Sequence, residues 1–256
     1  MIAAMCEQLV ARAPDPFRLE ALWPLVGRME RYGIAGFGWG VAWLADDGSL
    51  GAHRDTRAFR DDPEREALGA IETTSVLVHL RRPSRLSTIQ LPDTQPFVDP
   101  ARRFAFAHNG DFATWTAARD RYRAAGRIAG RADSEVAARS LEDAWVPAAD
   151  VAAMLARLHA ELGGPANLAV LARDGTPHHY AGNAENPVFA FRLGHIGMAA
   201  TGLYSLDRSL FKLAAPGATE RAVVRLHTSV TLDRRGRPVV TTADGASRSP
   251  GGRTGG

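Results

Sequence analysis

The pattern of apolar and polar residues along this chain predicts two groups of strands separated by helices. Apolar runs bounded by polar turns predict strands over residues 7–13, 75–82 and 103–110, since Val, Leu and Phe favour extended structure. Residues 38–54 predict a hairpin, because the pair Asp47-Gly48 lies between two apolar segments.

Helical periodicity marks two further segments. Over residues 14–33 we expect a helix with Asp15 as its cap, Pro16 at its first position and Gly33 at its end. Its apolar stripe consists of Leu19, Leu22, Trp23, Val26 and Met29. A second stripe, over residues 147–164 and closed by Gly163, consists of Val151, Met154, Leu155, Leu158 and Leu162.

Short apolar runs return after residue 165 and predict a second group of strands up to about residue 242. The order of strands, then helices, then strands indicates an α+β layered fold rather than a parallel sheet with alternating helices. No Pro/Gly/Ser linker divides the middle, so we expect one domain over residues 6–240. Residues 1–5 stand before it, and the glycine-rich tail 241–256 is expected to be disordered.

Composition narrows the classes of function. The chain has 256 residues and a net charge of +3, which is too small to indicate a nucleic-acid partner without clustering. No apolar run approaches the roughly 20 residues of a membrane span, and the first residues do not form a secretory signal. The single cysteine, Cys6, excludes an intramolecular disulfide, so a cytoplasmic setting is the simplest expectation.

Four places combine reactive or polar side chains with the ends of predicted elements: Cys6, residues 79–84, residues 106–112 and residues 130–135. Each has an ordinary structural interpretation when it is taken alone. These are a buried small thiol, a solvated strand edge, an Asn-Gly turn and a helix cap.

Together these places are more specific. The chain has Cys6, then His79 to Arg81 closing a strand, His108 to Gly110 closing another, and Asp133 to Glu135 opening a helix. This order resembles the class II glutamine amidotransferases of the N-terminal nucleophile (Ntn) hydrolase superfamily. The segments 36–43, 93–97 and 200–207 also resemble parts of the stand-alone members of that family, although Phe37-Gly38 departs from their usual sequence.

The resemblance implies a four-layer αββα sandwich with the nucleophile at the start of a central strand. Cys6 would attack the γ-amide carbonyl of glutamine, and its own α-amino group would serve as the base, since such amines titrate near pH 7.7 to 8.0. The side-chain amide of Asn109 and the backbone N–H of Gly110 would stabilise the oxyanion of the tetrahedral intermediate.

The resemblance also assigns the groups that bind substrate. Arg81 would pair with the α-carboxylate of glutamine and Asp133 with its α-ammonium. Ser84 lies where relatives carry a threonine or serine that lines the pocket. Arg82 is expected to face outward, and it would replace Arg81 if the strand register were shifted by one residue.

The five residues before Cys6 conflict with this chemistry, because a nitrogen inside a peptide bond is not a base. Met5 could be the true initiator, with removal of the methionine exposing Cys6. A short propeptide could instead cleave itself. If residues 1–5 persist, the protein is not an active hydrolase.

The leading hypothesis is therefore cleavage of glutamine, or of another γ-glutamyl compound, through a γ-glutamyl thioester. Ammonia would go to water or to a separate synthase subunit, since no Rossmann or P-loop pattern and no second domain is evident. No cofactor and no metal are expected, because the adjacent His178 and His179 would point to opposite faces of a strand. The alternatives are a different N-terminal Cys amidase and a non-catalytic glutamine-binding or regulatory module.

Overall fold

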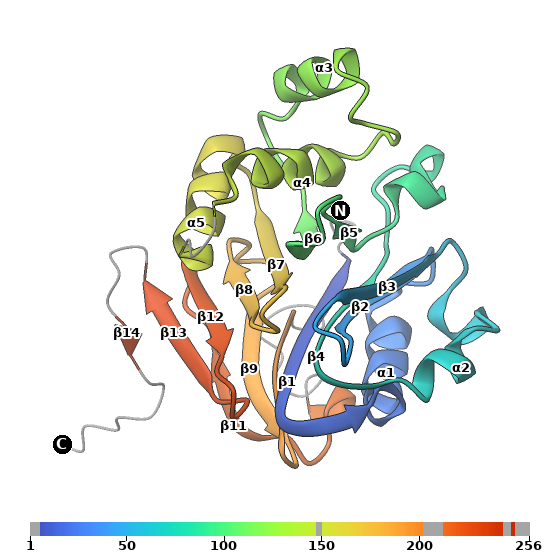
Figure 1. The fold of residues 1–256 in the computed structure, drawn as a ribbon, viewed down its shortest axis with the longest axis vertical. Helices are drawn as coiled ribbons and strands as arrows, with labels where there is room; N and C mark the ends of the chain where they lie inside the picture. The colour runs from blue at the N-terminus through green and yellow to red at the C-terminus, as the bar shows by residue number, and fades with distance from the viewer. Residues whose placement is uncertain (1–5, 147–149, 202–211, 243–246, 249–256) are drawn as a thin grey trace.

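Two antiparallel sheets of seven strands each form the centre of the molecule (Figure 1). The computed structural model describes residues 6–146, 150–201, 212–242 and 247–248. The first sheet has the order β11-β9-β10-β1-β4-β2-β3 and the second β14-β13-β12-β8-β7-β6-β5. The strands of the first sheet are β1 Glu7–Arg18, β2 Trp39–Leu44, β3 Leu50–Asp55, β4 Glu72–Leu80, β9 Val188–Leu193, β10 Ile196–Thr201 and β11 Thr219–Val223. Those of the second are β5 Phe97–Val98, β6 Phe104–Gly110, β7 Ala166–Ala172, β8 Pro177–Ala181, β12 Thr228–Leu232, β13 Pro238–Thr242 and β14 Ser247–Arg248.

Helices cover the outer faces of both sheets. The α-helices are α1 Trp23–Gly33, α2 Arg65–Gly69, α3 Thr116–Ala124, α4 Asp133–Ala144 and α5 Val151–Leu162. Short 3-10 turns are η1 Leu19–Leu22, η2 Phe59–Asp61, η3 Leu86–Thr88 and η4 Leu91–Asp93. The helix α1 packs on the first sheet, whereas α4 and α5 pack on the second.

Three apolar clusters define the four layers. One joins the first sheet to α1, with Val26 and Met29 at its centre, and another joins the second sheet to α4 and α5. The third lies between the two sheets and contains Val10, Leu77 and Leu171. The α+β class and the αββα sandwich expected from the sequence are therefore confirmed.

The alternation of side chains along the strands decides what reaches the space between the sheets. On β1, Val10 belongs to the inter-sheet cluster and Leu9 to the helix-facing cluster. On β6, Ala105 and Ala107 face the other sheet, whereas Phe106 faces α4 and α5. Since side chains alternate with a period of two, Cys6 and Asn109 share the inward-facing register of these strands.

The expected start of the first helix is wrong. Strand β1 continues to Arg18, and the helix begins at Trp23 after the 3-10 turn Leu19–Leu22. Residues 14–16 are exposed, at a shift of register between Arg12 and Phe17 in the pairing with β4. Prolines are tolerated at such an irregularity because the missing N–H breaks no ladder bond. Pro24, not Pro16, occupies the first turn of the helix, and the predicted end at Gly33 is confirmed.

The remaining elements agree with the sequence pattern. The hairpin β2–β3 turns at the Asp-Gly pair, with Val41 opposite His53. The helix α5 buries all five residues of its predicted stripe and ends at Gly163, while Asp150 caps it by accepting a hydrogen bond from Ala153 N. Three helices separate the two groups of strands, as expected.

Three sequence-based expectations fall wholly or partly outside the described residues. Residues 1–5 lie outside them, as does most of the segment 200–207. Within the tail 241–256, Thr241 and Thr242 end β13 and residues 247–248 form β14, which pairs with β13. The rest of that tail is outside the described residues.

Candidate active site

Cys6 lies immediately before β1, where the ends of the two sheets meet. Its Sγ accepts a hydrogen bond from Arg82 N at 3.4 Å and lies 3.6 Å from Arg82 O. Burial raises the pKa of the Cys6 thiol to about 11, although the hydrogen bond from Arg82 and the charge of Arg81 oppose the shift. The thiol is therefore protonated at neutral pH and needs a base before it can act as a nucleophile.

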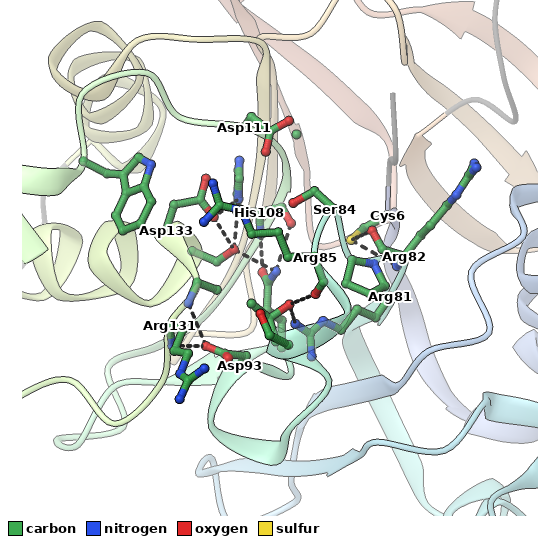
Figure 2. Close-up of a pocket in the computed structure, with 18 of the residues that line it drawn as sticks. Cys6, Arg81, Arg82, Ser84, Arg85, Asp93, His108, Asp111, Arg131 and Asp133 are labelled. Carbon is green, nitrogen blue, oxygen red and sulfur yellow. Dashed lines mark hydrogen bonds and ion pairs between the residues drawn. The ribbon is translucent and has the colours of Figure 1, made fainter. Parts of the chain in front are cut away.

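A cavity of about 330 Å³ opens beside Cys6 (Figure 2). Five of the six predicted site residues line it: Cys6, Arg81, Ser84, Gly110 and Asp133. The sixth, Asn109, is fully buried and stands behind this lining. The structure thus brings together residues that are far apart in the sequence.

Arg81 lines this cavity, and one nitrogen of its guanidinium has no hydrogen-bond partner among the described residues. The residue is 4% exposed, and its Nη2 donates to Thr88 Oγ1 at 2.8 Å. Its Nη1 is buried and has no hydrogen-bond partner among the described residues. Hydrogen bonds of the backbone with Phe37 and Gly38 hold the Arg81 peptide in place. This guanidinium therefore keeps one buried nitrogen whose hydrogen-bonding capacity the described residues leave unused.

Asp133 is the first residue of α4 and does not cap that helix, because Ala132 occupies the cap position and makes no side-chain cap bond. The Asp133 carboxylate accepts a hydrogen bond from Phe112 N at 3.0 Å and lies 4.0 Å from His108 Nδ1. The N–H groups of Arg131 and Ala132 are bound instead by Asp93 Oδ1, at 2.6 and 2.7 Å. The helix-cap interpretation is therefore wrong for Asp133.

The backbone conformation at position 110 and the closeness of a neighbouring carbonyl both require a glycine there. Its φ of +122° lies where residues with a side chain are strained, and an added Cβ would lie 1.9 Å from Pro165 O. The oxyanion role expected of its N–H gives one reason for a glycine, because that N–H must approach the substrate closely. Contact with the adjacent strand gives a second reason that the sequence alone could not reveal.

The Asn109 side chain is oriented toward the nucleophile. Its Nδ2 donates to Cys6 O, and its Oδ1 lies 3.4 Å from both Asn167 Nδ2 and Asn186 Nδ2. Asn186 Nδ2 also donates to Cys6 O, at 3.4 Å. A cluster of three buried asparagines therefore surrounds the backbone of Cys6.

Ser84 and Arg82 complete the cavity wall. Ser84 is exposed and lines the cavity, as expected. Arg82 contacts Cys6 through its backbone, and Figure 2 shows its side chain directed away from Asp133. In the pairing of β1 with β4, Gln8 lies opposite His79, and both Arg81 and Arg82 line the cavity.

Sequence analysis missed the residues that hold the second-sheet side of the site. Gln95 Oε1 accepts a hydrogen bond from His108 N at 2.6 Å, and Gln95 Nε2 donates to His108 O at 3.1 Å. Ser134 Oγ lies 3.1 Å from both Gln95 Nε2 and His108 Nδ1. The segment 93–97 was recognised only as a loop, and its polar residues gave no sign of these partners.

Among the described residues, His53, Asp55 and Asp62 form a cluster that could hold a metal ion. Arg57 Nη2 pairs with Asp55 Oδ2 at 2.6 Å, and Asp62 Oδ2 accepts from Trp39 Nε1 at 2.9 Å. Since these carboxylates are already bonded to protein groups, the cluster fits a hydrogen-bonded support for β2 and β3.

Cys6 thus lies before the first strand of an αββα sandwich and lines a cavity together with Arg81 and Asp133. A sequence model described as "Glutamine amidotransferases class-II" matches residues 21–184. The chain belongs to this family of amidotransferases and glutamine-amide hydrolases. The matched range begins after Cys6 and includes Arg81, Asn109 and Asp133.

Solved structures with the same fold include glutamine phosphoribosylpyrophosphate amidotransferase from B. subtilis, complexed with ADP and GMP (TM-score 0.68, 15% identity). A second is described as the allosteric regulatory enzyme of purine biosynthesis (TM-score 0.68, 16% identity). Each match covers 95% of this chain and 49% of the other, so this chain spans about half of their length. A glutamine aminotransferase class-II domain protein from Silicibacter pomeroyi has TM-score 0.59 and 19% identity, with 94% of this chain and 98% of that one covered.

Among curated protein sequences no match is found. None of the helices in the described part of the chain is both long and apolar enough to cross a membrane.

Proposed function

We propose that this protein hydrolyses the γ-amide of glutamine, or of another γ-glutamyl compound, through a γ-glutamyl thioester on Cys6. The observation that carries the proposal is Arg81, which lines the cavity beside Cys6 and keeps one buried guanidinium nitrogen, Nη1, without a partner among the described residues. A buried guanidinium nitrogen without a partner is costly unless a ligand satisfies it. The α-carboxylate of the substrate supplies that partner.

The reaction needs a base, because the Cys6 thiol retains its proton at neutral pH. The α-amino group of Cys6 takes that role once residues 1–5 have been removed. It accepts the thiol proton while sulfur attacks the γ-carbonyl carbon, and it returns the proton to the leaving nitrogen as the C–N bond breaks. Water then attacks the thioester, the C–S bond breaks, and the γ-carboxylate and the thiol are released.

The negative charge on the tetrahedral oxygen is stabilised by the Asn109 side-chain amide and the Gly110 N–H. Support for this role comes from Asn109 Nδ2, which already faces the backbone of Cys6. Arg81 and Asp133 bind the α-carboxylate and the α-ammonium, and Ser84 lines the pocket. A Cys amidase for apolar acyl groups fits less well, because the Arg81 and Asp133 side chains would then bring two charged groups against an apolar ligand.

The ammonia either enters water or passes to a separate synthase subunit. Release of ammonia and glutamate in equal amounts by the purified chain alone would support the hydrolytic fate. Turnover that begins only when another protein is added would support transfer. The cytoplasmic setting expected from the single cysteine remains a prediction.

The decisive experiment is the intact mass of the protein produced from its native gene, with and without 6-diazo-5-oxo-norleucine. A mass that starts at Cys6 and gains one adduct supports the proposal, and Cys6→Ser should gain none. A mass that retains residues 1–5 and gains no adduct, together with no turnover of glutamine, would refute it and leave a binding module.

A further inference from the structure

Three asparagines meet behind the nucleophile, although the mechanism above uses only one of them. Asn109 is the last residue but one of β6, and Asn167 lies directly opposite it on β7. Asn186 comes from the loop between β8 and β9. All three are 0% exposed. Polar side chains so deeply buried are normally retained for the hydrogen bonds that they make.

The oxygen and the nitrogen of the Asn109 side-chain amide have different neighbours. Its Oδ1 receives Asn167 Nδ2 and Asn186 Nδ2, each at 3.4 Å. Its Nδ2 donates to Cys6 O. A side-chain amide that turned by 180° would place its NH₂ against two other donors, so only one orientation is compatible with these neighbours.

Asn167 is itself fixed in orientation. Its Oδ1 accepts hydrogen bonds from Gly182 N at 3.0 Å and Asn183 N at 3.1 Å. Its Nδ2 must therefore point the other way, toward Asn109 and toward Asn186 O, which it reaches at 2.8 Å. Backbone N–H groups, which cannot change role, thus determine the direction of Asn167 and, through it, of Asn109, whereas Asn186 Oδ1 has no partner among the described residues.

We propose that Asn167 and Asn186 are positioning residues that hold the Asn109 amide with its NH₂ toward Cys6 and the developing oxyanion. The inference rests on the proposed function, in which Asn109 is an oxyanion donor. Such donors act by being oriented before charge develops, so a side chain that is free to turn would lose much of its effect.

The test is a double-mutant cycle between Asn109 and Asn186. Asn109→Ala should lower kcat on the order of 100- to 1,000-fold, as loss of an oxyanion donor typically does. Asn186→Ala should lower kcat by less, roughly 10- to 100-fold, with KM unchanged. Asn186 Nδ2 also donates to Cys6 O at 3.4 Å, but its proposed effect on the oxyanion runs through Asn109, so the double variant should be no slower than Asn109→Ala alone.

Two further variants guard against a merely structural explanation. Asn186→Asp preserves the shape but puts an oxygen against Asn109 Oδ1, so kcat should fall at least as far as in Asn186→Ala. Tyr180→Phe is the matched control. Tyr180 lies on β8 of the same sheet, and the substitution removes a buried hydroxyl that contacts His159 Nδ1 and His227 Nδ1. This control should lower the melting temperature without lowering kcat.

The rate of Cys6 alkylation by iodoacetamide measures the reactivity of the thiol in a reaction that forms no oxyanion. This rate should be the same in the wild type and in Asn186→Ala, which would place the defect after the thiol. Additive losses in the double variant, or unchanged kcat in both Asn186 variants, would overturn the inference. A wild type that turns over no γ-amide would remove the proposed function and this inference with it, whereas an active wild type with an unaffected Asn109→Ala would remove the oxyanion role alone.

Discussion

The polar groups that the two sheets place near the site differ in how many of their hydrogen-bonding atoms have partners. On the first sheet, Glu7 Oε1, both side-chain polar atoms of Gln8 and Arg81 Nη1 are buried without a hydrogen-bond partner in the described part of the chain. On the second sheet, the Gln95 amide is bonded at both ends and the Asn109 amide likewise has neighbours at both ends, although His108 Nε2 is also buried without a partner in the described part of the chain.

This difference separates binding from orientation. A group that will bind substrate must have free hydrogen-bonding capacity, and burial makes that capacity valuable because water does not compete for it. A group that stabilises a transition state must instead be fixed beforehand by its protein neighbours. Changes at Cys6 and Arg81 should therefore alter the nucleophile and substrate affinity, and changes at Asn109 and its partners should alter the rate after binding.

The largest expected effect is the loss of the nucleophile. Cys6→Ser should lower glutaminase activity by on the order of 1,000-fold or more, because a hydroxyl is a far weaker nucleophile than a thiolate. The fold should remain, since the substitution replaces one small side chain with another. Ammonia release and the melting temperature measure the two effects, and substantial remaining turnover would show that another nucleophile operates.

The sequence predicted candidate residues from both sides of the site but not the partners that orient them. Cys6 and Arg81 are single side chains at the ends of apolar strands, so a motif in the sequence is enough to find them. The partners of Asn109 come from β7 and from a loop 77 residues further along the chain, and no local pattern connects them. In the same way Asp93, not the nearby Asp133, binds the N–H groups of residues 131 and 132.

The fold shows the same limit at its first helix. The apolar stripe from Leu19 to Met29 was predicted correctly, and it is buried. The start of the helix was wrong, because Asp15 and Pro16 are as suitable for an exposed strand irregularity as for a helix cap. Only the pairing of Phe17 with Thr73 and of Arg18 with Glu72 extends the strand there. Periodicity therefore identifies the buried face, whereas long-range pairing decides where elements begin.

Removal of the free guanidinium should have the next largest effect. Arg81→Ala should lower kcat/KM for glutamine roughly 10- to 100-fold, mainly through KM, because a charge-assisted hydrogen bond to the α-carboxylate is lost. An analogue whose α-carboxylate is replaced by an amide should lose much less. Steady-state kinetics on the two substrates gives the comparison, and an equal loss on both would contradict the carboxylate role.

A smaller effect is expected from Asp133→Asn. The Asn oxygen can still accept from Phe112 N, so the substitution removes the charge and preserves that contact. The KM for glutamine should rise several-fold while the melting temperature stays nearly constant. Asp150→Ala is the matched control, because Asp150 caps α5 and its loss should cost about 1 kcal/mol of stability without changing KM. A fall in melting temperature with unchanged KM in Asp133→Asn would assign Asp133 a structural role only.

The smallest change concerns Glu7, the buried carboxyl beside the nucleophile. Burial raises the pKa of Glu7 well above its ordinary value of 4.5, even though the Thr201 hydroxyl donates to it. Below pH 4.5 the carboxyl is protonated in both the folded and the unfolded chain, so it adds no pH dependence. Above that pH the unfolded chain loses the proton while the folded chain retains it, and the stability of the wild type falls as the pH rises.

Glu7→Gln removes this ionisation but keeps an oxygen for Thr201. The variant should therefore match the wild type in melting temperature near pH 4 and exceed it increasingly toward pH 8, by at most about 1.4 kcal/mol of unfolding free energy per pH unit. Calorimetry at several pH values measures the difference, with the exposed Glu72→Gln as a control that should show no such trend. If the Glu7→Gln difference were constant with pH, the carboxyl would be ionised in the folded protein. The unpartnered Glu7 Oε1 would then belong to a buried carboxylate that is charged, rather than to a neutral carboxylic acid.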